Sequence, residues 1–265
     1  MKKLISLLLS AVLLMSVLAL GGCSSTDTKD IKYVKDKGTL VVGVVDAPPL
    51  TVQEDGEWSG FAIDLAKDFA KKLGVEVEFL EIDWSRMEAL LNDKTIDCVS
   101  SALTLTAERK AAMECTAPYL NNDQIVVMKK SIARNYAEAE ECLQLKFAVL
   151  DGSVHETLAK ENGFVLYATQ STEDALKAVS DGTVDAAIIN SILAGTMLGE
   201  GNEFPDLARS FRLKKTQMGF GFRQGSGLAE EMNEYFVTAY TSGRMTTMAK
   251  AYGLQKLIVE QVTEQ

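Results

Sequence analysis

The chain is poor in the residues that bind metals or carry redox chemistry. It has one histidine, His155, and four cysteines, with no CxxC or HxxxH spacing. Zinc sites and dithiol redox sites are built from such close pairs, so the sequence supports neither and no cofactor is expected. Apart from Cys23, the cysteines are Cys98, Cys115 and Cys142. We interpret these three as small apolar core residues first and as partners in one disulfide second.

Positive charge is also in short supply. Lysine and arginine number 27 against 37 acidic residues, which gives a net charge of -10. Nucleic-acid partners demand basic surface, so this class of partner is excluded. A hydrophobic fraction of 47% and a charged fraction of 24% are ordinary for a globular protein and argue against disorder and multipass membrane insertion. The length of 265 residues suits one large domain or two smaller ones.

The N-terminus has the pattern of an export signal. Two lysines are followed by the apolar stretch Leu4–Leu20 and by two glycines before Cys23. A single membrane span or a plain secretory signal is the weaker interpretation, because the stretch is short for a bilayer and a plain signal has no use for the cysteine. The ending L-G-G-C resembles a bacterial lipobox, which implies cleavage before Cys23 and a lipid on its sulfur. We therefore expect a signal peptide over 1–22 and a lipidated tether over 23–37, in which the polar segment Ser24–Asp30 is flexible.

The following segment predicts alternating strands and helices. Thr39–Val45 is a continuous β-branched run, typical of a strand buried on both faces, and it ends at Asp46 and two prolines. Apolar residues recur every four positions from Phe61 to Leu73, and Gly74 then predicts the end of a helix. The strands and helices are expected over 39–45, 60–73, 75–79, 85–93 and 96–101. This order predicts a parallel sheet with right-handed crossovers.

The same order starts again at Lys146. Thr183-Val-Asp185 echoes Thr95-Ile-Asp97, each after an apolar helix and at the entry to a buried strand. We therefore predict two similar α/β lobes. Extended segments at 119–130 and 217–222 would cross between them and form a hinge. The predicted lobes comprise residues 38–122 plus 217–265 and residues 123–216.

The stretch Ala102–Arg109 ends an apolar strand with two threonines and an arginine. Hydroxyls and the free N–H groups of a helix start can hold one side of a carboxylate, and the planar arginine fork can grip the other. The alternative is that Thr106 only caps a short helix over 107–113 while Arg109 lies in solvent. The stretch alone favours the capping interpretation.

Several short motifs match a known family in their order and spacing. They are Gly38-Thr-Leu-Val-Val-Gly-Val44, Gly60-Phe61 with Asp64, Ile96-Asp97, Thr104-Leu-Thr-Ala-Glu-Arg109, Ala117-Pro-Tyr119, Thr183-Val-Asp-Ala186 and Ser242-Gly-Arg244. Over essentially the whole mature chain, the sequence resembles the extracytoplasmic solute-binding proteins of ABC importers, in family 3, which takes polar amino acids. The resemblance implies an α/β fold of the two-lobed periplasmic-binding-protein type (type II). Each lobe would be a mostly parallel sheet flanked by helices, with a two-strand hinge.

The resemblance also implies how a ligand carboxylate would be held. Arg109 would clamp it, with a hydroxyl from Thr104 and a backbone carbonyl from Ala102 nearby. In the second lobe, the backbone N–H groups of Ser153 and Val154, at a helix start, would hold the same carboxylate from the other side. One ligand group would then bridge both lobes and favour their closure.

Four more residues follow from the resemblance. Trp84 would lie against the apolar stem of the ligand, although an ordinary core aromatic is an equally good interpretation. Asp46 lies on a loop expected to face the ligand. Asn190 stands where the family usually has an acid that receives the ligand ammonium, and it supplies no charge. Asp151, Asp46 or another carboxylate would have to replace that acid, or the ligand is not an ordinary α-amino acid.

By this resemblance the chain is a lipoprotein that captures an amino acid or related small carboxylate and delivers it to a membrane permease. We expect an exported monomer and no enzyme, held by its lipid at the outer face of the bacterial cytoplasmic membrane or on the periplasmic side of an envelope membrane. The alternatives are a dehydratase-like enzyme in the same cleft and a ligand-sensing surface protein. The enzyme needs a positioned acid or base, and His155 is expected to be a surface residue.

Overall fold

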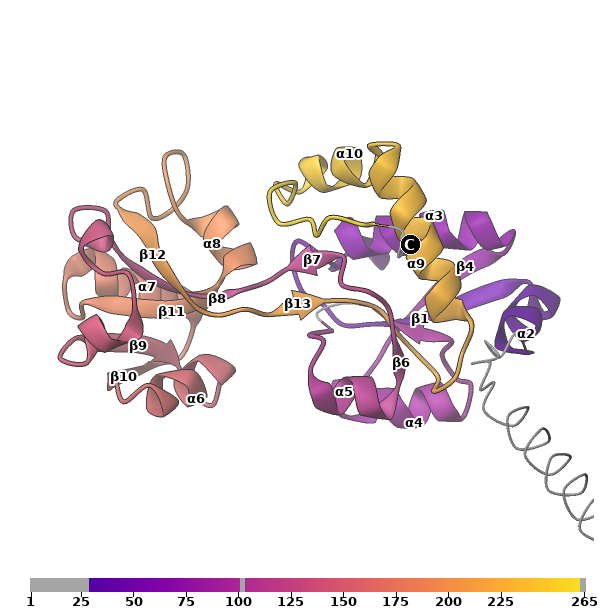
Figure 1. The fold of residues 1–265 in the computed structure, drawn as a ribbon, viewed down its shortest axis with the longest axis horizontal. Helices are drawn as coiled ribbons and strands as arrows, with labels where there is room; N and C mark the ends of the chain where they lie inside the picture. The colour runs from indigo at the N-terminus through magenta and orange to yellow at the C-terminus, as the bar shows by residue number, and fades with distance from the viewer. Residues whose placement is uncertain (1–28, 101–102, 263–265) are drawn as a thin grey trace, which may run out of the picture.

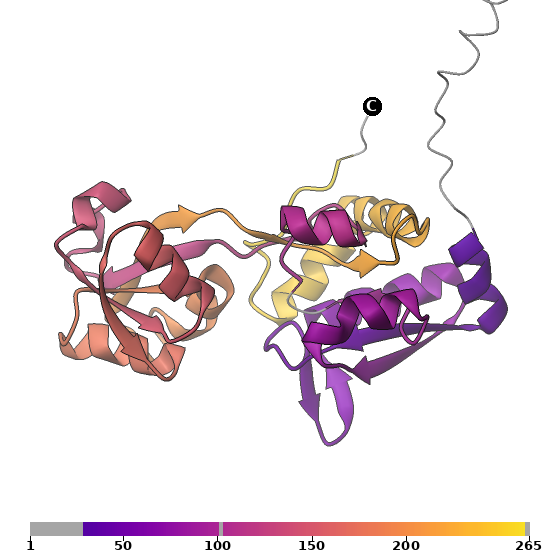
Figure 2. The same cartoon turned by 90° about the horizontal axis from the view of Figure 1, so that it is seen from below.

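The computed structural model describes residues 29–100 and 103–262, so the predicted signal peptide, Cys23 and Ala102 lie outside the described residues. Two α/β lobes are joined by extended strands that run between them (Figure 1). We call the lobe that contains strand β1 (Thr39–Val44) lobe 1, and the lobe that contains β8 (Gln124–Lys129) lobe 2. The view at right angles shows the same two bodies, with the hairpin of β2 (Val52–Glu54) and β3 (Glu57–Ser59) projecting from lobe 1 (Figure 2). The two-lobed α/β prediction is confirmed.

Lobe 1 is built on a five-stranded sheet in the order β4-β1-β5-β14-β6. Strand β1 pairs in parallel with β4 (Glu76–Glu81) and with β5 (Cys98–Val99), as the strand-helix-strand order predicts. The late strand β14 (Gly221–Phe222) pairs antiparallel with β5 and with β6 (Glu114–Cys115). The sheet therefore has a parallel centre, and its third strand is shorter than predicted.

Helix α3 (Phe61–Leu73) covers this sheet through the apolar stripe seen in the sequence. Phe61, Leu65 and Phe69 are all 0% exposed. The helix ends at Gly74, which has a φ of 77° and whose N–H donates to the carbonyls of the last turn. Besides the N-terminal helix α2 (Lys29–Lys37), the other lobe-1 helices are η1 (Trp84–Arg86), α4 (Met87–Asn92), α5 (Ala107–Ala112), α9 (Leu228–Thr241) and α10 (Arg244–Ala251).

Lobe 2 has a second five-stranded sheet, in the order β10-β9-β11-β8-β12. Strand β9 (Lys146–Leu150) pairs in parallel with β10 (Val165–Thr169) and β11 (Ala186–Asn190), whereas β8 pairs antiparallel with β11 and with β12 (Leu207–Lys214). Successive residues of β11 enter different apolar clusters on the two faces, so the sheet is buried on both sides. The helices are η2 (Ala133–Asn135), η3 (Ala139–Cys142), α6 (Val154–Glu161), α7 (Thr172–Asp181) and α8 (Ser191–Met197).

The two crossings between the lobes are extended and pair with each other. Strand β7 (Leu120–Asn121) leads out of lobe 1 into β8, and β12 leads back through β13 (Gln217–Met218). Strands β7 and β13 are antiparallel. The C-terminal segment joins them, because the Val259 N–H donates to the Tyr119 carbonyl at 3.0 Å. Rotation between the lobes would therefore be concentrated in these few residues.

Residues 29–37 are folded onto lobe 1, which corrects the prediction that the tether runs to residue 37. They form helix α2 (Lys29–Lys37), in which Val34 is fully buried. Asp30 accepts the Nε–H of Arg223 at 3.0 Å, and the Lys37 ammonium lies 2.6 Å from Asp97. The segment is mostly polar, and it is held by charges that lie far away in the sequence.

Candidate functional site

The predicted ligand residues follow the carboxyl ends of parallel strands in both lobes. Asp46 comes after β1, Trp84 after β4 and Thr104 after β5. In lobe 2, Ser153 comes after β9, and Asn190 is the last residue of β11. In open α/β sheets this edge is where ligands bind.

Arg109 is the positively charged residue among the predicted ligand residues of lobe 1. It lies half-buried on α5, with its guanidinium carbon 5.2 Å from the centre of the Trp84 ring and Nη1 3.2 Å from the Met87 sulfur. Attraction between the cation and the ring face holds the guanidinium while leaving in-plane N–H groups for an anion. No carboxylate among residues 29–100 and 103–262 pairs with Arg109. Met87 was missed by sequence reasoning, because nothing in a methionine marks contact with a cation.

The two threonines of the motif have different places. Thr106 caps α5, since its Oγ1 accepts the Arg109 backbone N–H at 3.2 Å. Thr104 forms an isolated β-bridge with Met218 of the returning hinge strand. The capping interpretation therefore applies to Thr106, but Arg109 is stacked on an aromatic ring rather than free in solvent.

The start of α6 is the element of lobe 2 that the sequence predicts to hold an anion. The Ser153 hydroxyl accepts the N–H groups of His155 and Glu156 at 3.2 and 3.3 Å, so it caps the helix. The Ser153 N–H donates to the Leu150 carbonyl at 3.3 Å. The Val154 N–H donates to no described residue, and the Val154 side chain is 55% exposed. Within the described chain, the Val154 amide at the positive end of the helix is therefore the one left open to an anion.

Asn190 is the cap of α8. Its Oδ1 accepts the Leu193 N–H at 2.9 Å, which identifies the oxygen and leaves an NH2 group as the other side-chain atom. That group only donates, and no described residue accepts from it. Asn190 therefore offers a ligand a hydrogen-bond donor and a partly used acceptor, with no negative charge.

Asp46 and Asp151 are exposed carboxylates near the same strand ends. Neither side chain pairs with a cation among the described residues. Each is thus available to receive an ammonium group. Ala102, predicted to supply a carbonyl, lies outside the described residues.

His155 is buried, which corrects the prediction of a surface histidine. It is 7% exposed, and its Nε2 lies 2.7 Å from Oε1 of Gln124. Burial lowers the pKa of His155 to about 4, so the ring is neutral at pH 7. Sequence reasoning missed the contact because it joins α6 to β8 across 31 positions of the chain.

The three described cysteines are free thiols. Cys98 and Cys142 are buried, and Cys115 is half-buried. Burial raises the pKa of each thiol, to about 11 for Cys142, and this keeps them protonated and unreactive. The described residues contain no cluster of side chains suited to a metal ion, and no helix among them has the length and apolar character to span a membrane.

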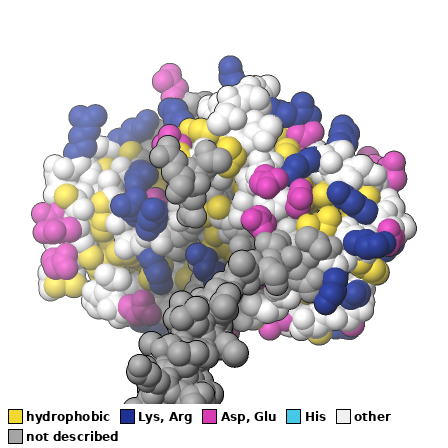
Figure 3. Space-filling view, turned by 45° about the vertical axis from the view of Figure 1, so that its right-hand side comes forward, with side chains coloured by type: hydrophobic (Ala, Val, Ile, Leu, Met, Phe, Trp, Pro, Cys, Tyr) yellow, Lys and Arg dark blue, Asp and Glu magenta, His cyan; other side chains and the backbone are white. Residues whose placement is uncertain are grey.

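Charges of both signs share the molecular surface. Figure 3 shows lysine and arginine side chains interspersed with acidic ones over the described residues of one face, with small apolar areas between them. Among the described residues, no single-sign patch covers this face.

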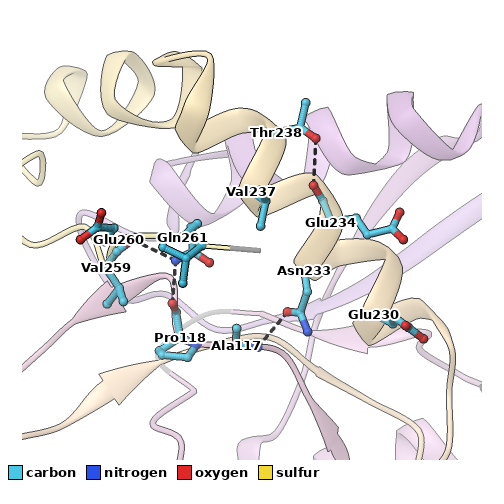
Figure 4. A pocket seen from close by; sticks show the side chains of 11 residues that line it. Ala117, Pro118, Glu230, Asn233, Glu234, Val237, Thr238, Val259, Glu260 and Gln261 are labelled. Carbon is cyan, nitrogen blue, oxygen red and sulfur yellow. Dashed lines mark hydrogen bonds between the residues drawn. The ribbon is translucent and has the colours of Figure 1, made fainter. Parts of the chain in front are cut away.

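A separate pocket of about 730 Å³ lies on lobe 1 (Figure 4). It is bounded by α9, by the turn before β7 and by the C-terminal segment. Asn233 accepts the Ala117 N–H at 2.8 Å, and Gln261 donates to the Pro118 carbonyl at 2.9 Å. None of the predicted ligand residues lines this pocket, so it is not part of the candidate site.

Several known proteins similar to this chain are named as amino-acid-binding proteins. The chain is 25% identical over 246 residues to the L-cystine-binding protein TcyJ of Escherichia coli (strain K12), covering 90% of this chain and 92% of that protein. It is 25% identical over 258 residues to the arginine-binding extracellular protein ArtP of Bacillus subtilis (strain 168), covering 95% and 98%. Among solved structures, an ancestral cationic amino acid solute-binding protein (AncCDT-1) has a TM-score of 0.72 at 27% identity, covering 84% of this chain and 98% of that one.

Some similar proteins carry the name of an enzyme. The membrane-bound lytic murein transglycosylase F of Idiomarina loihiensis is 28% identical over 250 residues, which cover 89% of this chain but 54% of that protein. The match to the model of the bacterial extracellular solute-binding proteins, family 3, spans residues 40–255. The predicted resemblance is confirmed, and the chain belongs to this family.

Proposed function

We propose that the chain is the solute-binding component of an ABC importer for an amino acid or a related small carboxylate. The observation that carries this proposal is the Arg109 guanidinium on the Trp84 ring in lobe 1, which pairs with no carboxylate of the described residues, together with the Val154 amide at a helix start in lobe 2, which donates to none of them. A carboxylate held by both groups would bridge the lobes and stabilise a closed arrangement. The closed protein would then deliver its ligand to a membrane permease.

The ligand class follows from the same groups. Arg109, Thr104 and the α6 start suit a carboxylate, and Trp84 offers an apolar face to a side chain. The ammonium of an α-amino acid would be received by Asp46 or Asp151 rather than by the uncharged Asn190. Because similar proteins are named for arginine and for cystine, L-arginine and L-cystine are the first compounds to test.

Export and anchoring are part of the proposal. Residues 1–22 would be removed, and Cys23 would carry the lipid that holds a monomeric protein at the outer face of the cytoplasmic membrane. Mass spectrometry of the mature protein tests this, because lipid on Cys23 adds a diacylglycerol mass that Cys23→Ser cannot carry. A protein that keeps residues 1–22, or that starts at another residue, would contradict the anchor.

A thermal-shift screen of the twenty amino acids, L-cystine and simple carboxylates tests the binding function. A ligand that binds only the folded state stabilises it by about 2.7 kcal/mol at 100 times its Kd, which raises the Tm by roughly 5 °C or more. Arg109→Ala should abolish the shift, and Arg109→Lys should reduce it because the planar fork is lost. Arg134→Ala, at an exposed position of lobe 2, is the matched control and should keep the shift. A shift that survives Arg109→Ala would refute the proposed site.

The enzyme alternative predicts a different result. A dehydratase needs an acid or base positioned on the substrate, and the one histidine is buried and bound to Gln124. Binding without turnover supports the receptor. Loss of a prephenate-like compound on incubation, monitored by chromatography, would favour the enzyme.

A further inference from the structure

His155 connects the anion-binding start of α6 to the hinge. It lies in the first turn of α6, and its imidazole reaches Gln124, the first residue of β8, where the chain enters lobe 2. The Nε2 to Oε1 distance is 2.7 Å. His155 is 7% and Gln124 6% exposed, so the bond is sheltered from water. A buried hydrogen bond of this kind has no solvent competitor.

The hinge fixes the orientation of both partners. The Gln124 amide nitrogen donates to the Asn122 carbonyl at 3.1 Å and to the Thr216 hydroxyl at 3.2 Å. Its oxygen therefore faces His155, which must donate from Nε2. The His155 Nδ1 is then an unprotonated, buried atom with no partner among the described residues. Thr216 lies on the returning crossing, so Gln124 bonds to both segments that join the lobes.

The same hinge residues also hold the start of α8. The Ser191 N–H donates to the Asp123 carbonyl at 2.8 Å, and the Ile192 N–H donates to the Asn122 side chain at 3.4 Å. The helix starts that follow β9 and β11, one with the Val154 amide and one with Asn190, are therefore both attached to residues 122–124. A change of backbone angle in this segment would move the two helix starts together.

We propose that His155 is a positioning residue that acts through Gln124. The hydrogen bond between the two residues couples the position of the α6 start to the conformation of the hinge. Binding of the anion and rotation of the lobes would then occur together. This inference rests on the proposed function. Without the contact, the Gln124 oxygen is buried without a donor, and α6 can tilt relative to the hinge. The start of α6 and the hinge residues 122–124 should then both become more mobile.

Native-state hydrogen exchange of the ligand-free protein tests the coupling. His155→Leu and Gln124→Met should each raise the exchange rate by about tenfold, both in α6 and at the Asn122 N–H of the hinge. His155→Gln keeps a donor and should restore rates to within about threefold of the natural chain. Thr157→Gly, an exposed change that weakens α6 alone, is the control and should leave Asn122 unchanged. If His155→Leu does not fold, Gln124→Met carries the same test. A rise confined to α6 in His155→Leu, or confined to the hinge in Gln124→Met, would overturn the proposal.

Calorimetric titration with L-arginine, and with L-cystine as second probe, measures the consequence for binding. His155→Leu and Gln124→Met should each raise the Kd about tenfold or more, since Gln124→Met also loses the bonds to Asn122 and Thr216. The double variant should bind no more weakly than the weaker-binding single variant, because the bond between the two residues is lost in both. Fully additive losses would overturn the coupling. If neither amino acid binds the natural chain, these two compounds are excluded as ligands, while the exchange experiment still decides whether the contact couples α6 to the hinge.

Discussion

Single residues decide which ligand groups the site can accept. The Arg109 guanidinium is held by Trp84 and Met87 before any ligand is present, so little side-chain entropy remains to be lost on binding. The residues expected at the ammonium end of the ligand are less well suited to hold a charge, because Asn190 is uncharged and Asp46 and Asp151 are exposed. We therefore expect strong recognition of a carboxylate and weaker recognition of an ammonium.

Asn190→Asp should strengthen the recognition of a ligand ammonium. The new carboxylate keeps the capping oxygen for the Leu193 N–H and replaces the NH2 group by a charged acceptor. A hydrogen bond to a charged group contributes about 1.5–3 kcal/mol, so the Kd for L-arginine should fall about tenfold or more. Isothermal titration measures it, with Asn202→Asp in an exposed turn of lobe 2 as the control. Weaker binding in Asn190→Asp would show that Asn190 serves an acceptor on the ligand instead.

The lowered pKa of the buried His155 predicts that the folded protein loses stability in mild acid. In the unfolded chain the pKa is near 6.5, and burial lowers it to about 4 in the folded protein. The stability that comes from the neutral ring is therefore complete above pH 6.5 and is lost as the pH falls to 4, by up to about 3 kcal/mol.

Urea unfolding at a series of pH values checks this expectation. His155→Gln does not titrate, so its free energy of unfolding should fall less between pH 6.5 and 4 than that of the natural chain. Parallel curves for the two proteins would mean that His155 is not the titrating group.

At the scale of elements, α2 depends on a buried cluster of charges. The Arg223 guanidinium is 9% exposed and lies 3.0 Å from Asp30 and 3.2 Å from Asp97, whose side chain is fully buried. It also donates to the Ile96 carbonyl at 2.7 Å. Asp97 further accepts from Lys37, so the cluster ties α2 to β5 and to the segment after β14.

Arg223→Met should therefore lower the free energy of unfolding strongly. It leaves a buried carboxylate without one of its partners, a change that costs about 3–5 kcal/mol. Arg244→Met is the matched control, since Arg244 is 57% exposed in its pair with Asp68 and its loss should cost about 1 kcal/mol or less. Urea unfolding at pH 7 compares the two. Equal losses would contradict the role given to the buried cluster.

Elements whose signal is local were predictable, and those held by distant partners were not. Helix α3 follows from its apolar spacing and the glycine at its end. Helix α2 has a weak apolar face, and its partners Asp97 and Arg223 are far along the chain, so the sequence predicts a tether there. The burial of His155 was missed for the same reason. Within the site, the order of strands placed the candidate residues, but the contact between Met87 and Arg109 needed coordinates. The exact lobe boundaries and the ligand roles stay predictions.

The whole molecule is organised for movement between two bodies. Each lobe has its own sheet and its own apolar clusters, whereas the connection is made by two paired crossings and the C-terminal segment. Candidate ligand groups lie on both sides of this connection. A ligand that binds both lobes shifts the population toward a closed state by the difference in its affinity for the open and closed forms.

Small-angle X-ray scattering measures directly whether a ligand that binds both lobes closes the protein. It is measured on the natural chain and on Arg109→Ala, with and without the amino acid that gives the largest thermal shift. The radius of gyration of the natural chain should fall at saturation, and that of Arg109→Ala should stay unchanged at the same concentration. A saturated natural chain that keeps its open dimensions, or an Arg109→Ala variant that closes equally well, would contradict the claim that a carboxylate bridges the two lobes.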